Sequence, residues 1–268
     1  MTKEQFQEKI LPFLKQYAEE EYLYLTAPEQ DRKRKSWYAS DFQKCPRGLY
    51  YDRLGGYTKK QLPEFVKNVG HEGKMKELEI IVKHILNGTE ILSTQERLYD
   101  DQLDVSGRPD MVIKENGTVL VEEVKTKSSR AFWYNVYQDE NGMKQFRPYP
   151  HEVGQLTYYI EKMNKKYEGI QGRLRYKSRD DGTEMLVPIT FDQYKWQEFF
   201  LFFQNLNNCW KEKVLPQPTE SILFNPQTNK FELNFQASYC DYHHLCMNDM
   251  NWESKAKKEA YLKNVSTR

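Results

Sequence analysis

Two carboxylates and one ammonium group lie in the central stretch of residues 107–127, at Asp110, Glu123 and Lys125. Carboxylate oxygens are the ligands that hard cations such as Mg²⁺ and Mn²⁺ prefer. A lysine beside them can hold or activate a water molecule, or stabilise developing negative charge. If the three side chains meet, this stretch has the chemistry of a divalent-metal site with a lysine directed at water.

A β-hairpin would bring these three side chains together. Apolar runs at 111–113 and 119–121 flank the turn signal Asn116-Gly117, which is typical of a hairpin. Side chains alternate along a strand, so Glu123 and Lys125 project from the same face, and the hairpin can return Asp110 beside them. The alternative is a surface hairpin whose Glu and Lys are solvated, as these residues usually are.

The composition limits the classes of protein to consider. The chain has 268 residues, 38% of them hydrophobic and 14% aromatic, which is enough for one large domain or two small ones. Its net charge of +1 excludes a global basic field, so any contact with nucleic acid must be local. We find no apolar run of membrane-spanning length and no signal-peptide pattern, and four cysteines do not suggest a disulfide scaffold. The expected location is cytoplasmic.

The elements around the hairpin follow from hydrophobic spacing and chain breakers. We expect a helix that opens near Ser40, as its N-cap, and contains Cys45. The strand-and-turn segment 89–106 leads into the hairpin, and strands at 172–178 and 184–189 surround a turn. Helices are expected at 4–25, 37–56, 59–87, 151–168 and 191–214.

The segment 128–150 is aromatic and moderately basic. Aromatic rings beside cations are the components of a groove that stacks nucleic-acid bases. Core packing or dimer contacts explain the aromatic side chains almost as well. The candidates for contact with DNA in this segment are Arg130, Trp133, Tyr134 and Arg147.

Several motifs occur in a fixed order along the chain. They are SxFxxCPRxxYYxxLG at 40–55, a Gly-His pair at 70–71, GRPD followed by ExK, QLTYY at 155–159, and a C-terminal cysteine group. In this order they resemble the RecB-type branch of the PD-(D/E)xK nucleases. Within that branch the likeness is to the CRISPR-associated Cas-four exonucleases and related phage or AddB-type enzymes. It covers roughly residues 36–250.

The resemblance implies a role for each matching residue. The divalent metal would be held by His71, Asp110, Glu123 and the carbonyl of Val124. Lys125 would position or help to deprotonate the attacking water, and Gln155 and Tyr159 would hold Lys125 or the scissile phosphate. Asp104 and Glu122 are the nearest other carboxylates, and strand alternation turns Glu122 away from the face of Glu123.

The implied fold is α/β, with a PD-(D/E)xK restriction-endonuclease-like core. A central mixed sheet would be flanked by helices, and a cysteine-bearing lobe would join the N- and C-terminal segments. We predict one nuclease domain over 1–268. Its parts are an N-terminal helix and linker (1–35), a helical lobe and nuclease core (36–226), a cysteine segment (227–250) and a charged tail (251–268).

The implied activity is metal-dependent hydrolysis of single-stranded DNA from an end, 5′ to 3′, with Mg²⁺ or Mn²⁺ as cofactor. The context would be CRISPR adaptation, with its partner proteins, or phage recombination and repair. The alternative is a catalytically inert, DNA-binding subunit of such a complex. Because the whole set of matching site residues is present, we favour the active enzyme.

The cysteines depart from the family pattern. Iron–sulfur members of the family pair one cysteine of the CPRxxYY helix with a C-terminal CxxCx5C group. Here Cys45, Cys240 and Cys246 match, whereas Ala237 occupies the fourth position. Three alternatives follow: an iron–sulfur cluster on three cysteines or with a substitute ligand, a metal-free site, or a zinc site that adds His243 or His244. We favour the cluster or its remnant.

Overall fold

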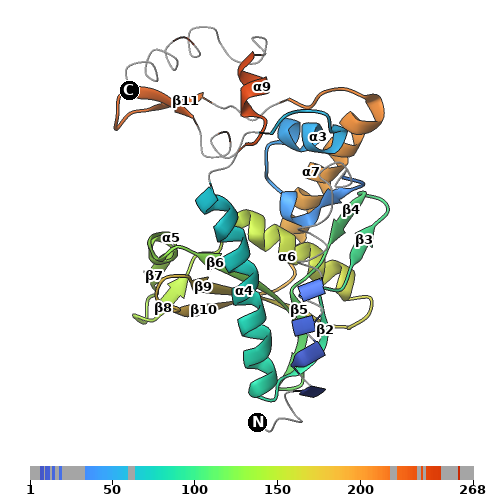
Figure 1. Cartoon of the computed structure of the whole chain (residues 1–268), viewed down its shortest axis with the longest axis vertical. Helices are drawn as coiled ribbons and strands as arrows, with labels where there is room; N and C mark the ends of the chain where they lie inside the picture. Colours follow the sequence, from blue (N-terminus) through green and yellow to red (C-terminus); the bar gives the residue numbers. More distant parts are fainter. Residues whose placement is uncertain are drawn as a thin grey trace.

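The computed structural model describes residues 34–59, 64–217, 222–233 and 240–248, together with Ala237 and isolated residues towards the two ends of the chain (Figure 1). The side chains of residues 64–71 lie outside this description. The helix expected over 4–25 and the tail expected over 251–268 fall largely outside the described residues.

A five-stranded mixed sheet forms the centre of the molecule, in the order β10-β9-β6-β5-β2. Strands β6 and β9 pair in parallel, and the other neighbours pair antiparallel. The predicted central mixed sheet is therefore confirmed. The strands are β2 (Glu90–Thr94), β5 (Met111–Glu115), β6 (Thr118–Lys127), β9 (Gln171–Ser178) and β10 (Glu184–Ile189).

The predicted hairpin is present as β5 and β6. Glu115 pairs with Thr118 across a two-residue turn. Asn116 has φ +50° and Gly117 has φ +82°, the left-handed conformation that such turns need and that these two residues adopt at little cost. The local sequence alone therefore sets the register of the strand that carries Glu123 and Lys125.

Helices cover both faces of the sheet (Figure 1). Helix α4 (Glu64–Leu86) packs Ile80 and Ile81 against Met111 and Ile113 on one face. On the other face lies α6 (Pro150–Met163), which in turn packs against α7 (Gln193–Glu212). No described helix is both long and apolar enough to cross a membrane.

The segment before α4 differs from the expected single helix over 37–56. It forms a short strand β1 (Trp37–Tyr38), a 3-10 helix η2 (Ala39–Asp41) and then α3 (Pro46–Leu54). Cys45 is the N-cap of α3 rather than an internal residue, and Ser40 lies within η2. Proline lacks an N–H and is favoured in the first turn of a helix, so Pro46 moves the helix start beyond Cys45.

Smaller elements complete the fold. Strand β1 joins β4 (Val105–Gly107) and β3 (Leu98–Asp100) in a second sheet of order β1-β4-β3. Between β6 and β9 the chain forms α5 (Ser129–Tyr134), β7 (Val136–Gln138) and β8 (Lys144–Phe146). Further along the chain lie β11 (Ile222–Asn225), β12 (Lys230–Leu233) and α9 (His243–Asn248).

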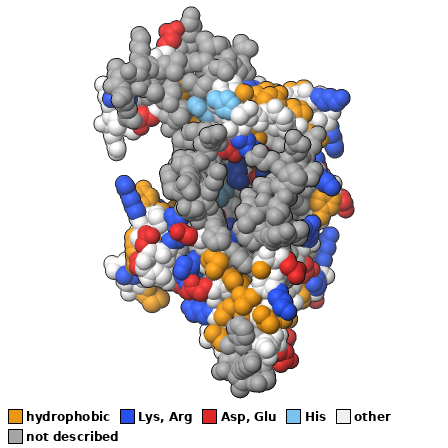
Figure 2. Space-filling model, in the orientation of Figure 1, with side chains coloured by type: hydrophobic (Ala, Val, Ile, Leu, Met, Phe, Trp, Pro, Cys, Tyr) orange, Lys and Arg blue, Asp and Glu red, His pale blue; other side chains and the backbone are white. Residues whose placement is uncertain are grey.

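Charged side chains of both signs are mixed over the described surface in view (Figure 2). This mixture agrees with the net charge of +1. A partner that carries many charges of one sign would therefore have to be recognised locally rather than by the field of the whole molecule.

A buried ionic cluster lies between α4 and the sheet. Glu122 is fully buried there, and Arg175 Nε donates to its Oε1 at 2.7 Å. Arg173 pairs with the same carboxylate, and His84 Nε2 lies 3.1 Å from it. Glu122 therefore faces α4, away from Glu123, as strand alternation predicts.

This cluster makes stability depend on acidity. Burial raises the pKa of Glu122, but hydrogen bonds from His84 and Arg175 outweigh it and lower the pKa to about 2. A carboxyl whose pKa is depressed in the folded protein contributes stability above its unfolded pKa, and that stability is lost as pH falls through the folded value. We therefore expect the contribution of Glu122 to disappear between about pH 4.5 and about pH 2.

Replacing Glu122 with glutamine tests the cluster. It removes the buried carboxylate that Arg173 and Arg175 share, so we expect a loss of about 3–5 kcal/mol of unfolding free energy at pH 7, measured by urea denaturation. The difference from wild type should shrink as pH falls from 4.5 towards 2. Glu115→Gln, at the exposed rim of the same cluster, is the control and should cost less than about 1 kcal/mol. Equal stability of Glu122→Gln and wild type at pH 7 would contradict this account.

Candidate active site beside the hairpin

Asp110, which directly precedes β5, and Glu123, which lies on β6, are neighbours. The backbone N–H of Asp110 points at Glu123 Oε2 at 3.4 Å. Asp110 Oδ2 accepts a hydrogen bond of 2.7 Å from the backbone N–H of Val124. The hairpin thus returns Asp110 beside the strand that carries Glu123, and two carboxylates share one small region.

Lys125 and Gln155 form a closed hydrogen-bonded triangle with Glu123. Lys125 Nζ donates to Glu123 Oε1 and to Gln155 Oε1, each at 2.9 Å. Gln155 Nε2 donates to the same Glu123 oxygen at 2.8 Å. Gln155 is on α6, so this helix fixes the orientation of the lysine on β6.

Tyr159 connects the triangle to the loop that carries Asp110. Gln155 and Tyr159 lie one helical turn apart on α6, and Gln155 Nε2 lies 3.0 Å from the Tyr159 hydroxyl. That hydroxyl donates to the carbonyl of Arg108 at 3.3 Å. A Cβ atom at Gly107 would lie 2.5 Å from the Tyr159 ring. Glycine is therefore required at this position for the ring to reach the site.

Glu77 is a third carboxylate near the site, and the sequence analysis did not identify it. Gln95 Nε2 donates both to Glu77 Oε1 and to Asp110 Oδ1. The signal was available: Glu77, Ile80, Ile81 and His84 have the i, i+3, i+4, i+7 spacing of one helix face. An acidic residue on the sheet-facing side of a helix is unusual enough to be a candidate site residue.

The site carries an excess of negative charge that its own groups only partly balance. Burial, together with the charges of Glu123 and Glu77, raises the pKa of Asp110 well above its ordinary value. Burial lowers the pKa of Lys125, but the charges of Glu123, Glu152 and Asp110 outweigh it, and the net shift is upward. Lys125 is therefore an ammonium ion at neutral pH, suited to binding an anion or orienting water rather than to accepting a proton.

The donor set fits a hard divalent cation in its chemistry. Burial and the charges of Glu123 and Glu77 disfavour the ionised form of Asp110, and a cation bound there would remove this cost. Two adjacent carboxylates with a third nearby are oxygen ligands of the kind that Mg²⁺ and Mn²⁺ select. Among the described side chains, no three of His, Cys, Asp and Glu are arranged as a complete metal-binding group. His71 belongs to α4, but its side chain lies outside the described residues. Val124 lies next to Glu123, and its N–H binds Asp110.

A second lysine lies on the same face of β6, two residues beyond Lys125. Lys127 Nζ donates to Glu152 Oε1 at 2.7 Å, and the Tyr176 hydroxyl donates to the other oxygen of Glu152 at 2.5 Å. Glu152 is only 4% exposed, in the first turn of α6. This buried group holds the start of α6 against the sheet next to the triangle.

The aromatic residues predicted to contact DNA lie in the segment of α5, β7 and β8, which flanks the central sheet. Trp133 is 41% exposed and Tyr134 is 88% exposed. Trp133 Nε1 donates to Asp181 Oδ2 at 3.1 Å, and Lys144 Nζ lies 5.2 Å from its ring centroid. Arg130 is exposed on α5, and the Arg147 guanidinium lies 5.7 Å from the ring of Tyr137. The phenylalanines of this segment, Phe132 and Phe146, are core residues instead.

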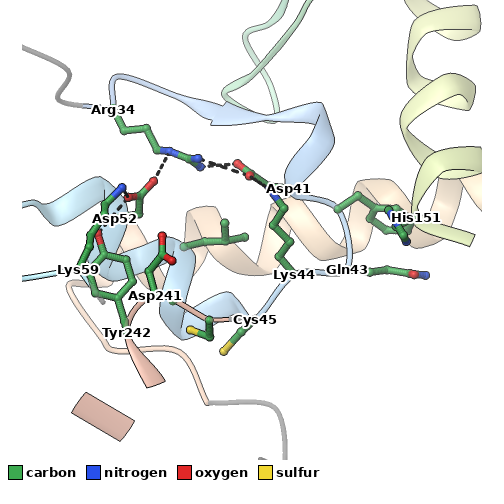
Figure 3. Close-up of a pocket in the computed structure, with 14 residues that line it drawn as sticks. Arg34, Asp41, Gln43, Lys44, Cys45, Asp52, Lys59, His151, Asp241 and Tyr242 are labelled. Carbon is green, nitrogen blue, oxygen red and sulfur yellow. Dashed lines mark hydrogen bonds and ion pairs between the residues drawn. The ribbon is translucent and has the colours of Figure 1, made fainter. Parts of the chain in front are cut away.

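Cys45 and Cys240 line one pocket between α3 and the C-terminal segment (Figure 3). The thiols of Cys45 and Cys240 are hydrogen-bonded to each other; this bond and burial raise the pKa of Cys240. A Cβ atom at Gly48 would lie 2.8 Å from Cys240 Sγ, so the thiol packs directly on α3. Cys246 is buried in an apolar cluster with Tyr51 and Tyr242, and Cys209 lies on α7.

Comparisons with known proteins give only distant likenesses. No protein-family model matches the chain, and no curated protein matches its sequence. The solved structure of SSO0001 aligns with a TM-score of 0.43 and 18% identity over 90% of this chain and 97% of that one. An alkaline exonuclease from Laribacter hongkongensis aligns with a TM-score of 0.40 and 13% identity over 68% of this chain and 94% of that one. Its complex with dAMP aligns with a TM-score of 0.41 and 12% identity over 67% and 91%. Likeness at this level carries no argument about activity.

Proposed function

We propose that the chain is a divalent-metal-dependent nuclease that hydrolyses phosphodiester bonds of DNA. The observation that carries the proposal is the hydrogen-bonded unit of Glu123, Lys125 and Gln155 beside Asp110. It combines anionic metal ligands, an oriented ammonium group and a second element that holds the ammonium group in place. These are the parts that phosphodiester hydrolysis requires.

Asp110 and Glu123, with Glu77 nearby, would hold the metal ion. Bound there, a divalent cation supplies charge neutralisation at the phosphate and lowers the pKa of a water molecule. The chain's own part is positioning: Gln155 holds the Lys125 ammonium group beside Glu123. From there Lys125 can orient water or stabilise the negative charge that develops on the phosphate oxygens.

For the finer function we propose exonucleolytic cleavage of single-stranded DNA, 5′ to 3′, in CRISPR adaptation or in phage recombination and repair. The motif order of the sequence supports this part of the proposal. Single-stranded DNA would be the substrate, and adaptation or recombination proteins would be the partners.

The deciding experiment incubates the purified protein with single strands labelled at the 5′ or the 3′ end, with Mg²⁺, with Mn²⁺ or with a chelator. Metal-dependent loss of one label before the other supports a directional exonuclease. Binding of the strand without cleavage under any metal would instead favour an inert DNA-binding subunit. A protein that neither binds nor cleaves the strands would refute the proposal.

We also propose that Cys45, Cys240 and Cys246 hold an iron–sulfur cluster or its remnant, with zinc as the alternative occupant. The contact between Cys45 and Cys240 supports a shared site. Cys246 is buried among tyrosines, and Cys240 packs against the same cluster. Anaerobic purification followed by metal analysis and an absorption spectrum distinguishes iron, zinc and no metal. A metal-free, stably folded protein would refute both occupied forms.

Trp133 tests the predicted contact between α5 and DNA. Stacking on a base is worth about 1–3 kcal/mol, so Trp133→Ala should weaken the affinity for single strands by at least ~5-fold, measured by fluorescence anisotropy in chelator. Trp133→Phe keeps a stacking ring and removes only the hydrogen bond to Asp181, so it should retain most of the affinity. Unchanged affinity of a folded Trp133→Ala protein would assign this segment to the core or to an interface.

A further inference from the structure

A cavity of about 600 Å³ opens beside the candidate active site, on the flank opposite α5. Gln95, Gln155 and Tyr159 line its inner side. Gln95 is hydrogen-bonded to Asp110, and Gln155 to Glu123. A molecule in this cavity would therefore be separated from the two carboxylates by the side chains that are hydrogen-bonded to them.

The outer side of the cavity is built from η2 and the β1-β4-β3 sheet and presents two kinds of group. Arg97 and Arg108 provide exposed guanidinium groups, and Tyr38 and Tyr99 provide rings that are 42% and 54% exposed. Guanidinium groups bind phosphate oxygens, and aromatic rings stack on bases whatever their sequence. Together they match the two repeating parts of a nucleic-acid strand.

The arginine nearest the site is tied to it through its backbone. The Tyr159 hydroxyl donates to the Arg108 carbonyl at 3.3 Å, and Tyr159 is hydrogen-bonded to Gln155, which donates to Glu123. Asp104, which accepts a hydrogen bond from the Tyr99 hydroxyl at 2.7 Å, is itself paired with Arg53. The pairing reduces the repulsion that this carboxylate would exert on a phosphate near Tyr99.

We propose that this cavity binds the nucleotides next to the scissile phosphate as a single strand. The inference rests on the proposed nuclease function and deepens it. A volume of about 600 Å³ lies within the ~300–1,000 Å³ range of cavities that enclose small ligands, which suits one or two nucleotides and excludes a duplex. Arg97 and Arg108 contact the phosphates, and Tyr38 and Tyr99 stack on the bases.

The test measures binding of a fluorescent single-stranded oligonucleotide to the full chain in chelator, over a range of salt concentrations. The double variant Arg97→Ala and Arg108→Ala should bind more weakly and should lower the salt slope of log K by roughly 1.4, since each phosphate contact on a single strand contributes about 0.7. Tyr99→Leu should weaken binding at least ~5-fold, whereas Tyr99→Phe, which keeps the ring, should retain affinity.

A charge-matched control separates a specific cavity from a general loss of positive charge. Lys83→Ala with Lys114→Ala removes the same charge beside a different cavity, near the hairpin turn. It should leave the salt slope unchanged. An equal effect of this control, or wild-type affinity and slope in the arginine double variant, would overturn the inference.

The failure of this inference and that of the proposed function are distinguishable. If the wild-type protein cleaves DNA with metal while the arginine double variant binds normally, the nuclease proposal stands and the strand takes another path. If the wild-type protein neither binds nor cleaves DNA, the proposed function fails, and the cavity inference fails with it.

Discussion

Asp110→Asn should reduce cleavage by at least ~10³-fold, because a metal ligand contributes several kcal/mol of transition-state stabilisation and each 1.36 kcal/mol is tenfold in rate. The amide oxygen can still accept the hydrogen bond from the Val124 N–H, so the fold should persist. Single-turnover cleavage at saturating Mg²⁺, with melting curves on the same samples, provides the measurement.

Although Asp110→Asn should lose activity, we expect it to keep its stability. In metal-free protein, burial and the charges of Glu123 and Glu77 disfavour an ionised Asp110, so asparagine should be at least as stable as aspartate there. Added Mg²⁺ or Mn²⁺ should raise the melting temperature of wild type but not of the variant. Glu140→Gln, at an exposed turn position, is the control that should behave as wild type. Cleavage by Asp110→Asn at the wild-type rate would refute the metal assignment.

Lys125→Met should reduce the cleavage rate by roughly 10²–10³-fold, the usual effect of removing one group that stabilises developing charge. Methionine fills the volume of the lysine stem without its charge. In the proposed mechanism Lys125 acts on water and phosphate rather than on the metal, so the metal-induced rise in melting temperature should remain. The split between a lost rate and a retained metal response identifies its role.

Lys127→Met is the matched control for this substitution. It removes a lysine from the same face of the same strand, but one that is bound to Glu152 rather than to Glu123. We expect a much smaller loss of rate and a measurable loss of stability, since buried Glu152 would lose its lysine partner and keep the Tyr176 hydroxyl, with His151 Nε2 3.9 Å away. Equal rate losses in the two variants would show that Lys125 has no special position.

The parts of the fold that the sequence predicted well are those that local interactions determine. The turn at Asn116-Gly117 specifies its own conformation and therefore the whole hairpin. Strand alternation then correctly assigned Glu122 and Glu123 to opposite faces. The expected strands at 172–178 and 184–189 are β9 and β10 nearly to the residue.

The incorrect prediction over 37–56 has a non-local cause. Strand β1 forms because Trp37 and Tyr38 pair with Val105 and Ser106, far along the chain. No short-range sequence pattern predicts that pairing. Glu77 was missed for a related reason. Its helix was predicted, and its spacing places it on the same face as Ile80 and Ile81, but the position of that face beside Asp110 depends on how α4 packs on the sheet.

The lobe around α3 is closed by contacts between the two ends of the chain. Trp37 Nε1 donates to Asn207 Oδ1 at 2.7 Å, across 170 residues. The Arg47 side chain donates to the Pro216 carbonyl across 169 residues, and the Tyr242 hydroxyl to Asp52 across 190. Such distant contacts cost more chain entropy to form than local ones and slow folding.

During synthesis on the ribosome, this order of contacts delays the folding of the lobe. Strand β1 and helix α3 are synthesised early, but the partners of Trp37 and Arg47 leave the ribosome only after almost the whole central sheet has been made. The hairpin that carries Glu123 can form long before that. During synthesis, the apolar side of α3 therefore stays exposed until α7 and the C-terminal segment have been made.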